Sequence, residues 1–139
     1  MAAGVSEQTE ICTSKKVLVV DDSATVRQQV RLALLGAGFD VVEACDGMEG
    51  AETINRVADL AAVICDVNMP RMGGLEMLES IKGDPKHATL PIVMLTTEGQ
   101  NALVQRAKLA GAKGWIVKPF KPELLLAAIR KLTSVTRSA

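Results

Sequence analysis

Short apolar runs alternate with amphipathic stretches over most of this 139-residue chain. Five runs are rich in Val, Ile, Leu and other strand-forming residues, and each is bounded by polar or turn-forming residues. The pattern predicts that all five are β-strands. The expected strands cover residues 17–20, 40–43, 61–65, 92–95 and 115–117.

The stretches between and after these runs repeat apolar residues at the spacing of a helix face, so a helix is expected to follow each strand. The periodic segments are 26–34, 48–54, 75–81, 103–110 and 125–132. Pro122 suits the first turn of the last helix, whereas Gly36, Gly38 and Gly111 suit helix ends.

Alternating strands and helices joined by right-handed crossovers produce a parallel sheet with helices on both faces. We therefore expect an α/β fold, a flavodoxin-like (βα)5 doubly wound sheet with strand order 2-1-3-4-5 in a three-layer sandwich. In this fold the ligand crevice lies at the carboxyl ends of strands 1 and 3.

The length suits one domain, and 48% of the residues are apolar, which is enough for a sizeable core. Aromatic residues make up only 2%, so the core must be aliphatic, as in a parallel sheet buried under helices. We expect a flexible leader at 1–14, the domain at 15–133 and a short tail at 134–139.

The balance of charge narrows the possible partners. Sixteen basic and sixteen acidic residues are spread along the chain, which excludes the electrostatic signature of a nucleic-acid-binding or membrane-binding protein. Three cysteines lack metal or redox spacing, no apolar run is long enough to span a membrane, and no signal peptide is recognisable. The sequence predicts a cytoplasmic protein without membrane insertion, and we expect a monomer.

Acidic residues follow two of the predicted strands. Asp21 and Asp22 come directly after the first strand, and Asp66 comes directly after the third. In the expected fold these three carboxylates meet at one sheet edge, where two charges 4 Å apart would repel by about 4 kcal/mol. A bound cation would relieve this repulsion, and Mg²⁺ prefers such oxygen ligands.

Further polar residues follow the same strand ends. Thr96 ends the fourth strand, Asn68 lies just beyond Asp66, and Lys118 follows the fifth strand. An aspartate can act as a nucleophile that carries a phosphoryl group, and a metal, an ammonium group and a hydroxyl would neutralise the phosphoryl oxygens. Asp66 is our candidate nucleophile, assisted by Mg²⁺, Lys118 and Thr96.

With these residues the chain resembles a known family, the bacterial two-component response-regulator receiver domains, and it is most similar to the stand-alone chemotaxis type. The resemblance extends over about residues 15–132. It is carried by the motifs VLVVDDS at 17–23, DVNMPRMGG at 66–74, LTTE at 95–98 and GAKGWIVKPF at 111–120.

The resemblance implies a role for each matching residue. Asp66 would accept a phosphoryl group from the phosphohistidine of a sensor histidine kinase, and Lys118 would pair with the phosphoryl oxygens. Asp22 would bind Mg²⁺ directly and Asp21 largely through water, while Asn68 would contribute its backbone carbonyl. The family usually has a cis peptide before the proline that corresponds to Pro119, which proline allows.

Thr96 and Trp115 match the two switch positions of the family, although Trp is less common there than Tyr or Phe. Asn68 and Glu98 resemble the residues that tune hydrolysis in chemotaxis-type receivers, so we expect fast self-catalysed dephosphorylation. Output would come through binding of a target protein. The expected partner surface is formed by the fourth helix, fifth strand and fifth helix, around Val104, Lys108, Trp115 and Lys131.

Single residues also have ordinary structural explanations. Asp22 or Ser23 could cap a helix, Asp66 could be a solvated strand end, and Lys118 could be a surface lysine. Their combination at one edge favours a site. We interpret His87 as a surface loop residue. Trp115 could be only a half-buried packing residue, and the apolar surplus at 124–127 fits either a partner face or extra core.

Three other functions would use parts of the same pattern. A phosphatase of the haloacid-dehalogenase type would need an acid two residues after the nucleophile, where this chain has Asn68. A flavodoxin-like cofactor site is disfavoured because Asp21 and Asp22 would repel a phosphate. A phosphorelay intermediate that passes the phosphoryl group to a histidine phosphotransfer protein stays open as an alternative to the signalling switch, and neither is an enzyme in the ordinary sense.

Overall fold

The computed structural model describes residues 15–67, 69, 72–97 and 101–134. Five parallel strands form one sheet in the order β2-β1-β3-β4-β5, which confirms the predicted fold and strand order. The strands are β1 (Lys16–Val20), β2 (Asp40–Ala44), β3 (Leu60–Asp66), β4 (Ile92–Thr96) and β5 (Gly114–Val117).

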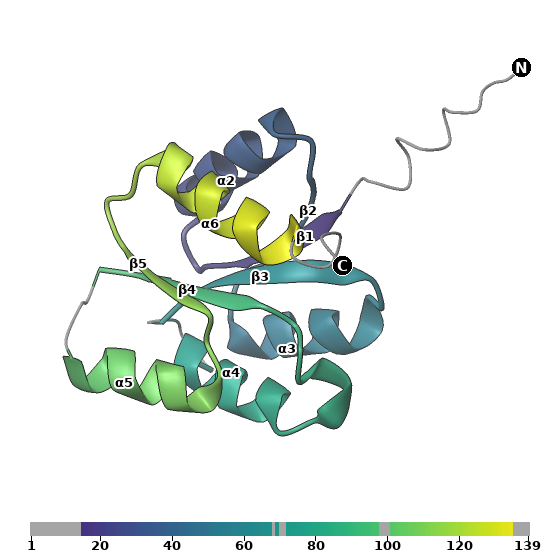
Figure 1. Ribbon diagram of the computed structural model, residues 1–139, viewed down its shortest axis with the longest axis vertical. Helices are drawn as coiled ribbons and strands as arrows, with labels where there is room; N and C mark the ends of the chain where they lie inside the picture. Colours follow the sequence, from purple (N-terminus) through teal and green to yellow (C-terminus); the bar gives the residue numbers. More distant parts are fainter. Residues whose placement is uncertain (1–14, 68, 70–71, 98–100, 135–139) are drawn as a thin grey trace, which may run out of the picture.

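Helices cover both faces of the sheet, as Figure 1 shows. One face is covered by α2 (Ala24–Gly36) and α6 (Pro122–Ser134). The other face is covered by α3 (Gly47–Arg56), α4 (Gly74–Lys82) and α5 (Asn101–Ala110). The three layers of the predicted sandwich are therefore present.

Side-chain alternation divides the core into two clusters. Along β1, Val17 and Val19 pack with the α2 and α6 side, whereas Leu18 and Val20 pack with the α3, α4 and α5 side. All four are fully buried. Because successive side chains of a strand point to opposite faces, an uninterrupted apolar run can fill both clusters.

Local sequence explains where several elements begin and end. Ser23 and Asp46 accept backbone N–H groups as N-caps of α2 and α3. Gly38 and Gly111 follow α2 and α5 with φ angles of 94° and 108°, a region that favours glycine. All of the predicted strands and helices are present, and their first and last residues differ from the predicted ones by at most a few positions.

His87 lies in the connection between α4 and β4, as its interpretation as a surface loop residue predicted. Pro85–His87 form a 3-10 turn that is capped by the side chain of Asp84, and the half-buried His87 ring lies 3.0 Å from Asn55 Oδ1. The apolar residues at 124–127 serve both of the purposes considered for them. Leu125 is buried and adds to the core, whereas Leu124 is 60% exposed and is available for a partner face.

Within the part of the chain that the structure describes, every helix is too short or too polar to cross a membrane. The expected leader at 1–14 and residues 135–139 of the expected tail lie outside the described residues.

Candidate functional site

Strand ends bring three charged side chains of the predicted site together. Asp21, Asp66 and Lys118 continue the alternation of β1, β3 and β5 toward the same face of the sheet. The ammonium of Lys118 lies 2.9 Å from Asp21 Oδ2 and 3.6 Å from Asp66 Oδ1. Lys118 is thus no ordinary surface lysine, because its charge is held between two buried carboxylates.

The Asp21 carboxylate is held at both oxygens. Oδ1 accepts the backbone N–H of Ser23 at 2.8 Å, and Oδ2 accepts the Lys118 ammonium. The residue is almost completely buried, whereas its neighbour Asp22 is exposed. The capping explanation therefore holds for Ser23, whose side chain accepts the backbone N–H of Val26.

The three predicted metal-binding carboxylates lie close enough to share one cation. One oxygen each from Asp21, Asp22 and Asp66 falls within 4.8 Å of the others. A set of hard oxygen donors with two buried members fits Mg²⁺ better than a softer transition metal. The donor set present in this chain is therefore suited to the ion that the sequence predicts.

Asp66 is in an environment that disfavours its charged form. Burial, followed by the neighbouring charge of Asp21, raises the pKa of the Asp66 carboxyl from 3.8 to about 6, and Lys118 opposes this shift. Its side chain is only 9% exposed. The explanation of Asp66 as a solvated strand end is therefore wrong.

The backbone after Asp66 is packed against the first turn of α4. The N–H of Gly74 donates to Val67 O at 2.9 Å, and Glu76 accepts the N–H of Gly73 at 2.7 Å. A Cβ atom on Gly74 would overlap the carbonyl oxygen of Asp66. The glycine therefore permits the close approach that fixes the backbone of the candidate nucleophile.

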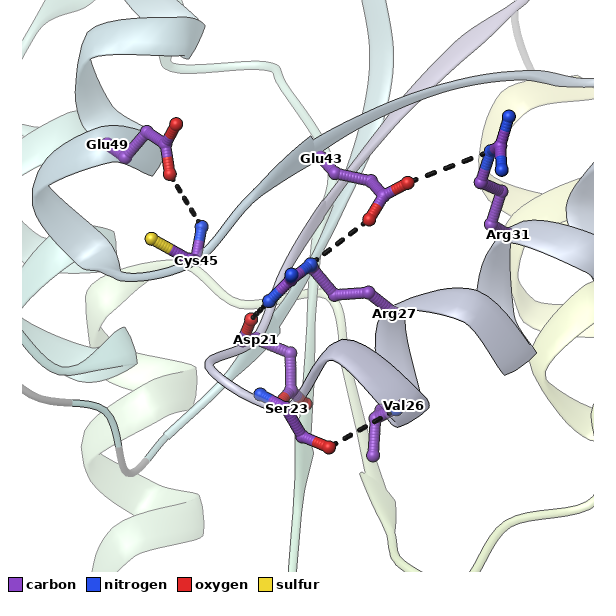
Figure 2. A network of polar contacts seen from close by, with 8 residues as sticks. All are labelled: Asp21, Ser23, Val26, Arg27, Arg31, Glu43, Cys45 and Glu49. Carbon is purple, nitrogen blue, oxygen red and sulfur yellow. Dashed lines mark hydrogen bonds and ion pairs between the residues drawn. The ribbon is translucent and has the colours of Figure 1, made fainter.

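A basic residue missed by the sequence analysis holds the turn that carries Asp21. Arg27 on α2 donates from Nη1 to the Asp21 carbonyl at 2.6 Å and from Nε to Glu43 on β2 at 3.0 Å. Glu43 also pairs with Arg31 at 3.7 Å, and Figure 2 shows the guanidinium of Arg27 between its two partners. A positive charge near a helix N-terminus is unfavourable because that end of the helix dipole is itself positive. The position of Arg27 in the sequence is therefore a signal that its guanidinium is stabilised by other groups.

Arg27→Gln is expected to destabilise the protein by about 1.5–3 kcal/mol, because a charged hydrogen bond to a carbonyl in a partly buried setting is lost. Arg31→Gln is the matched control, since its ion pair with Glu43 is longer and exposed and should contribute less than about 1 kcal/mol. Urea unfolding of both variants tests this difference. Equal losses would contradict the assigned role of Arg27.

The two residues at the predicted switch positions share the other face of the sheet. Thr96 is completely buried and continues the alternation of Ile92 and Met94, which pack with the α5 side. Trp115 is half-buried against the same cluster, and among the described residues its indole N–H has no hydrogen-bond partner. The backbone N–H of Lys118 donates to Thr96 O at 2.6 Å, and the peptide before Pro119 is cis.

Two predicted site residues, Asn68 as the carbonyl ligand and Glu98 as its partner in tuning hydrolysis, lie outside the described residues. The expected partner surface is present as three adjoining elements, with β5 as the edge strand between α5 and α6. Lys108 and Lys131 are exposed there, and Val104 and Trp115 are half-buried.

Comparison with known proteins identifies the class. Residues 17–130 match the model of the response regulator receiver domain family, and the chain belongs to that family. The family is a signalling module and not a classical enzyme.

Within the receiver domain family, the curated relatives of the chain are regulators of chemotaxis, as the motifs indicated. The chain is 43% identical over 111 residues to the chemotaxis protein CheY1 of Helicobacter pylori, which covers 79% of this chain and 90% of the relative. It is 42% identical to the chemotaxis protein CheY homolog of Campylobacter jejuni, with 79% and 85% of the two chains covered. The chain is a receiver domain homologous to the CheY chemotaxis regulators.

Solved structures agree with this assignment. CheY4 of Vibrio cholerae superposes with a TM-score of 0.81 and 40% identity, covering 86% of this chain and 99% of that one. The CheY of Borrelia burgdorferi, solved in a complex with CheX, BeF3 and magnesium, gives a TM-score of 0.78 and 29% identity over 85% of this chain and 88% of that one. The phosphorelay alternative gains no support from these relatives.

Proposed function

We propose that this protein is a phosphorylation-dependent switch in which Asp66 accepts a phosphoryl group from the phosphohistidine of a sensor histidine kinase. The observation that carries the proposal is the grouping of one buried carboxylate, one lysine ammonium and two further carboxylates at a single sheet edge. Both oxygens of Asp21 are held in short hydrogen bonds, whereas Asp66 lies 3.6 Å from the Lys118 ammonium, which supports Asp66 over Asp21 as the nucleophile.

In the proposed reaction an oxygen of Asp66 attacks the phosphorus atom, and the bond between phosphorus and the histidine nitrogen breaks. The electron pair of that bond returns to the imidazole, and an acyl phosphate forms on Asp66. When bound at the three carboxylates, Mg²⁺ supplies positive charge that offsets the phosphoryl oxygens. Lys118 supplies a second positive charge from a position already 3.6 Å from Asp66.

Reversal of the signal is proposed to be self-catalysed hydrolysis of the acyl phosphate. Water attacks phosphorus, Asp66 leaves as a carboxylate, and inorganic phosphate is released. We propose that Asn68 and Glu98 set this rate, on the basis of the resemblance to chemotaxis-type receivers.

Phosphorylation is proposed to act through the pair Thr96 and Trp115. Their common face and the unpartnered indole N–H support a coupled movement, because no hydrogen bond within the described residues holds the ring in place. The hydroxyl of Thr96 would turn toward the phosphoryl group, and the ring would then repack. A ligand or modification can act in this way only by favouring one of two conformations.

The output surface is proposed to be the α5, β5 and α6 face around Val104, Lys108, Trp115 and Lys131. Three apolar side chains on these elements are exposed without burial in the core. They are Leu109 at 88%, Leu124 at 60% and Val117 at 45%. Exposed apolar residues next to lysines are suited to a target protein with an apolar, acidic contact surface.

The fluorescence of Trp115, the only tryptophan of the chain, tests the proposed switch. We expect a saturable change in its intensity when Mg²⁺ and beryllofluoride, a phosphoryl mimic, are added together. The change should be absent in Asp66→Asn, because the mimic needs the carboxylate oxygen. Intact mass after incubation with phosphoramidate and Mg²⁺ should show one added phosphoryl group in the native protein only.

Each possible failure has a separate meaning. A native protein that gains no phosphoryl mass would overturn Asp66 as acceptor. A protein that gains the mass without any change in fluorescence would retain the acceptor but exclude Trp115 from the switch. Asp59→Asn is the matched control, because it removes an exposed carboxylate that precedes β3, at the opposite end of the strand from Asp66, and should leave both readouts unchanged.

A further inference from the structure

A cavity of about 860 Å³ lies at the amino ends of the strands, at the edge of the sheet opposite the acidic cluster. Lys15, Leu60, Pro91 and Lys113 line it at the points where β1, β3, β4 and β5 begin. Its volume falls within the range of small-molecule sites. The cavity shares no residue with the proposed phosphorylation site.

The lining combines an apolar floor with basic side chains. Ile54, Leu60, Leu90 and Leu132 contribute apolar surface from elements on both faces of the sheet. The basic side chains of the lining are Lys15, Lys86, His87 and Lys113. Among the described residues that line the cavity none is acidic, and no ion pair is found for its three lysines within the described part of the chain.

The lysines around the cavity carry more positive charge than is needed to balance the helix ends that lie beside it. Helices α3 and α6 end beside the cavity, and each helix C-terminus carries the equivalent of about half a negative charge. The three lysines outweigh that partial charge. Two acidic residues lie close in sequence to the lining: Asp59 is paired with Lys16 at 3.2 Å, and Asp84 caps the turn that carries Lys86 by accepting its backbone N–H at 3.0 Å.

One wall of the cavity is held in place by the half-buried side chain of Lys82. Its ammonium donates to the backbone carbonyls of His87, Ala88 and Leu90 at 3.1, 3.1 and 2.6 Å. The hydrogen bond between His87 and Asn55 joins the same wall to α3. Because these contacts fix the wall in the unliganded protein, a ligand would bind without the entropic cost of ordering it.

The positive charge of Lys113 affects the neighbouring ammonium of Lys82. Burial lowers the pKa of Lys82, and repulsion from Lys113 adds to that effect. A neighbouring anion would relieve the repulsion.

We propose that this cavity is a binding site for a small organic anion with an apolar body, such as an aromatic carboxylate, sulfonate or phosphate ester. The apolar floor would bury the body of the ligand, and Lys86 and Lys113, which both line the cavity, would pair with its charge. Such a ligand leaves the carboxyl ends of the strands open, so it could bind together with a phosphoryl group on Asp66.

Fluorescence titration with 8-anilinonaphthalene-1-sulfonate, an aromatic sulfonate, tests the proposal on the full chain. We expect saturable binding of one molecule, weakened about tenfold or more in Lys86→Gln/Lys113→Gln. The matched control Arg31→Gln/Lys121→Gln removes the same charge elsewhere and should bind as the native protein does. N-phenyl-1-naphthylamine, which lacks the sulfonate, should bind at least about tenfold more weakly than the anion.

Amide NMR shifts locate the bound probe and should change most at Leu60, Thr89 and Leu132. Equal affinity for the charged and uncharged probes, equal losses in the two double variants, or shifts confined to another face would overturn the proposal. A gain of about tenfold in Glu7→Gln/Glu10→Gln would assign the cavity to the chain's own acidic leader and would also overturn it. Unchanged probe binding in Asp66→Asn is expected, which separates this site from the proposed phosphorylation.

Discussion

Asp66→Asn is expected to stabilise the protein by about 3 kcal/mol at pH 7 when divalent cations are absent. The folded state raises the pKa of this carboxyl from 3.8 to about 6, because the side chain is buried and lies beside the charge of Asp21. A shift of that size corresponds to about 3 kcal/mol. Asparagine has nearly the same shape and carries no charge to desolvate.

The sign of the effect sets its pH dependence. The folded protein holds the Asp66 proton more tightly than the unfolded chain, so the stabilisation from protonation is complete below pH 3.8 and is lost as the pH rises through about 6. The free energy of unfolding of the native protein should therefore fall across this window relative to that of Asp66→Asn. Below about pH 4 the two proteins should be nearly equal.

Urea unfolding in the presence of EDTA at pH 4, 5.5 and 7 measures this difference. Asp59→Asn is the control, because this carboxylate is exposed in its pair with Lys16 and should change the free energy of unfolding by less than about 1 kcal/mol. Added Mg²⁺ should stabilise the native protein more than Asp66→Asn, since one ligand is lost in the variant. A difference that does not vary with pH would mean that Asp66 does not titrate as the structure indicates.

Gly74→Ala is expected to destabilise the protein by about 3 kcal/mol and to slow phosphorylation of Asp66. The added methyl group would overlap the carbonyl of Asp66, which belongs to the backbone and cannot move aside like a flexible side chain. To relieve the overlap, the first turn of α4 must separate from β3. That movement would displace the candidate nucleophile from Lys118.

Gly36→Ala provides the matched control for this substitution. A Cβ at Gly36 meets nothing within 4 Å, and the residue lies at the end of α2. The same chemical change should there be neutral or stabilise the protein by up to about 1 kcal/mol. Thermal unfolding and the rate of phosphoryl gain from phosphoramidate test both variants. A stable, normally phosphorylated Gly74→Ala protein would show that the close approach is not required.

Much of the fold follows from patterns within short segments. Each strand is a brief apolar run and each helix repeats apolar residues with its own period, so local sequence is enough to recognise the order of elements. The parallel strand order then follows because right-handed crossovers leave few other arrangements. Element ends were less predictable, since capping by residues such as Asp46 depends on local hydrogen bonds.

The grouping of Asp21, Asp22 and Asp66 was also predictable. All three follow strands that become neighbours, and parallel strands bring their carboxyl ends to one edge. The placement of Asn68 and Glu98 stays a prediction, as do the chemical roles of the site residues.

The sequence by itself determined the class of fold, the edge that carries the acidic residues and the family of signalling proteins. Each of these depends on patterns within short segments, which can be recognised without knowing how the segments pack together. Only the tertiary structure decided which partners the charges have. The contact of Arg27 with the Asp21 carbonyl, the overlap that keeps position 74 a glycine, and the gathering of Lys15, Lys86 and Lys113 around one cavity all join distant segments. No periodicity records such contacts, since they arise from packing between elements.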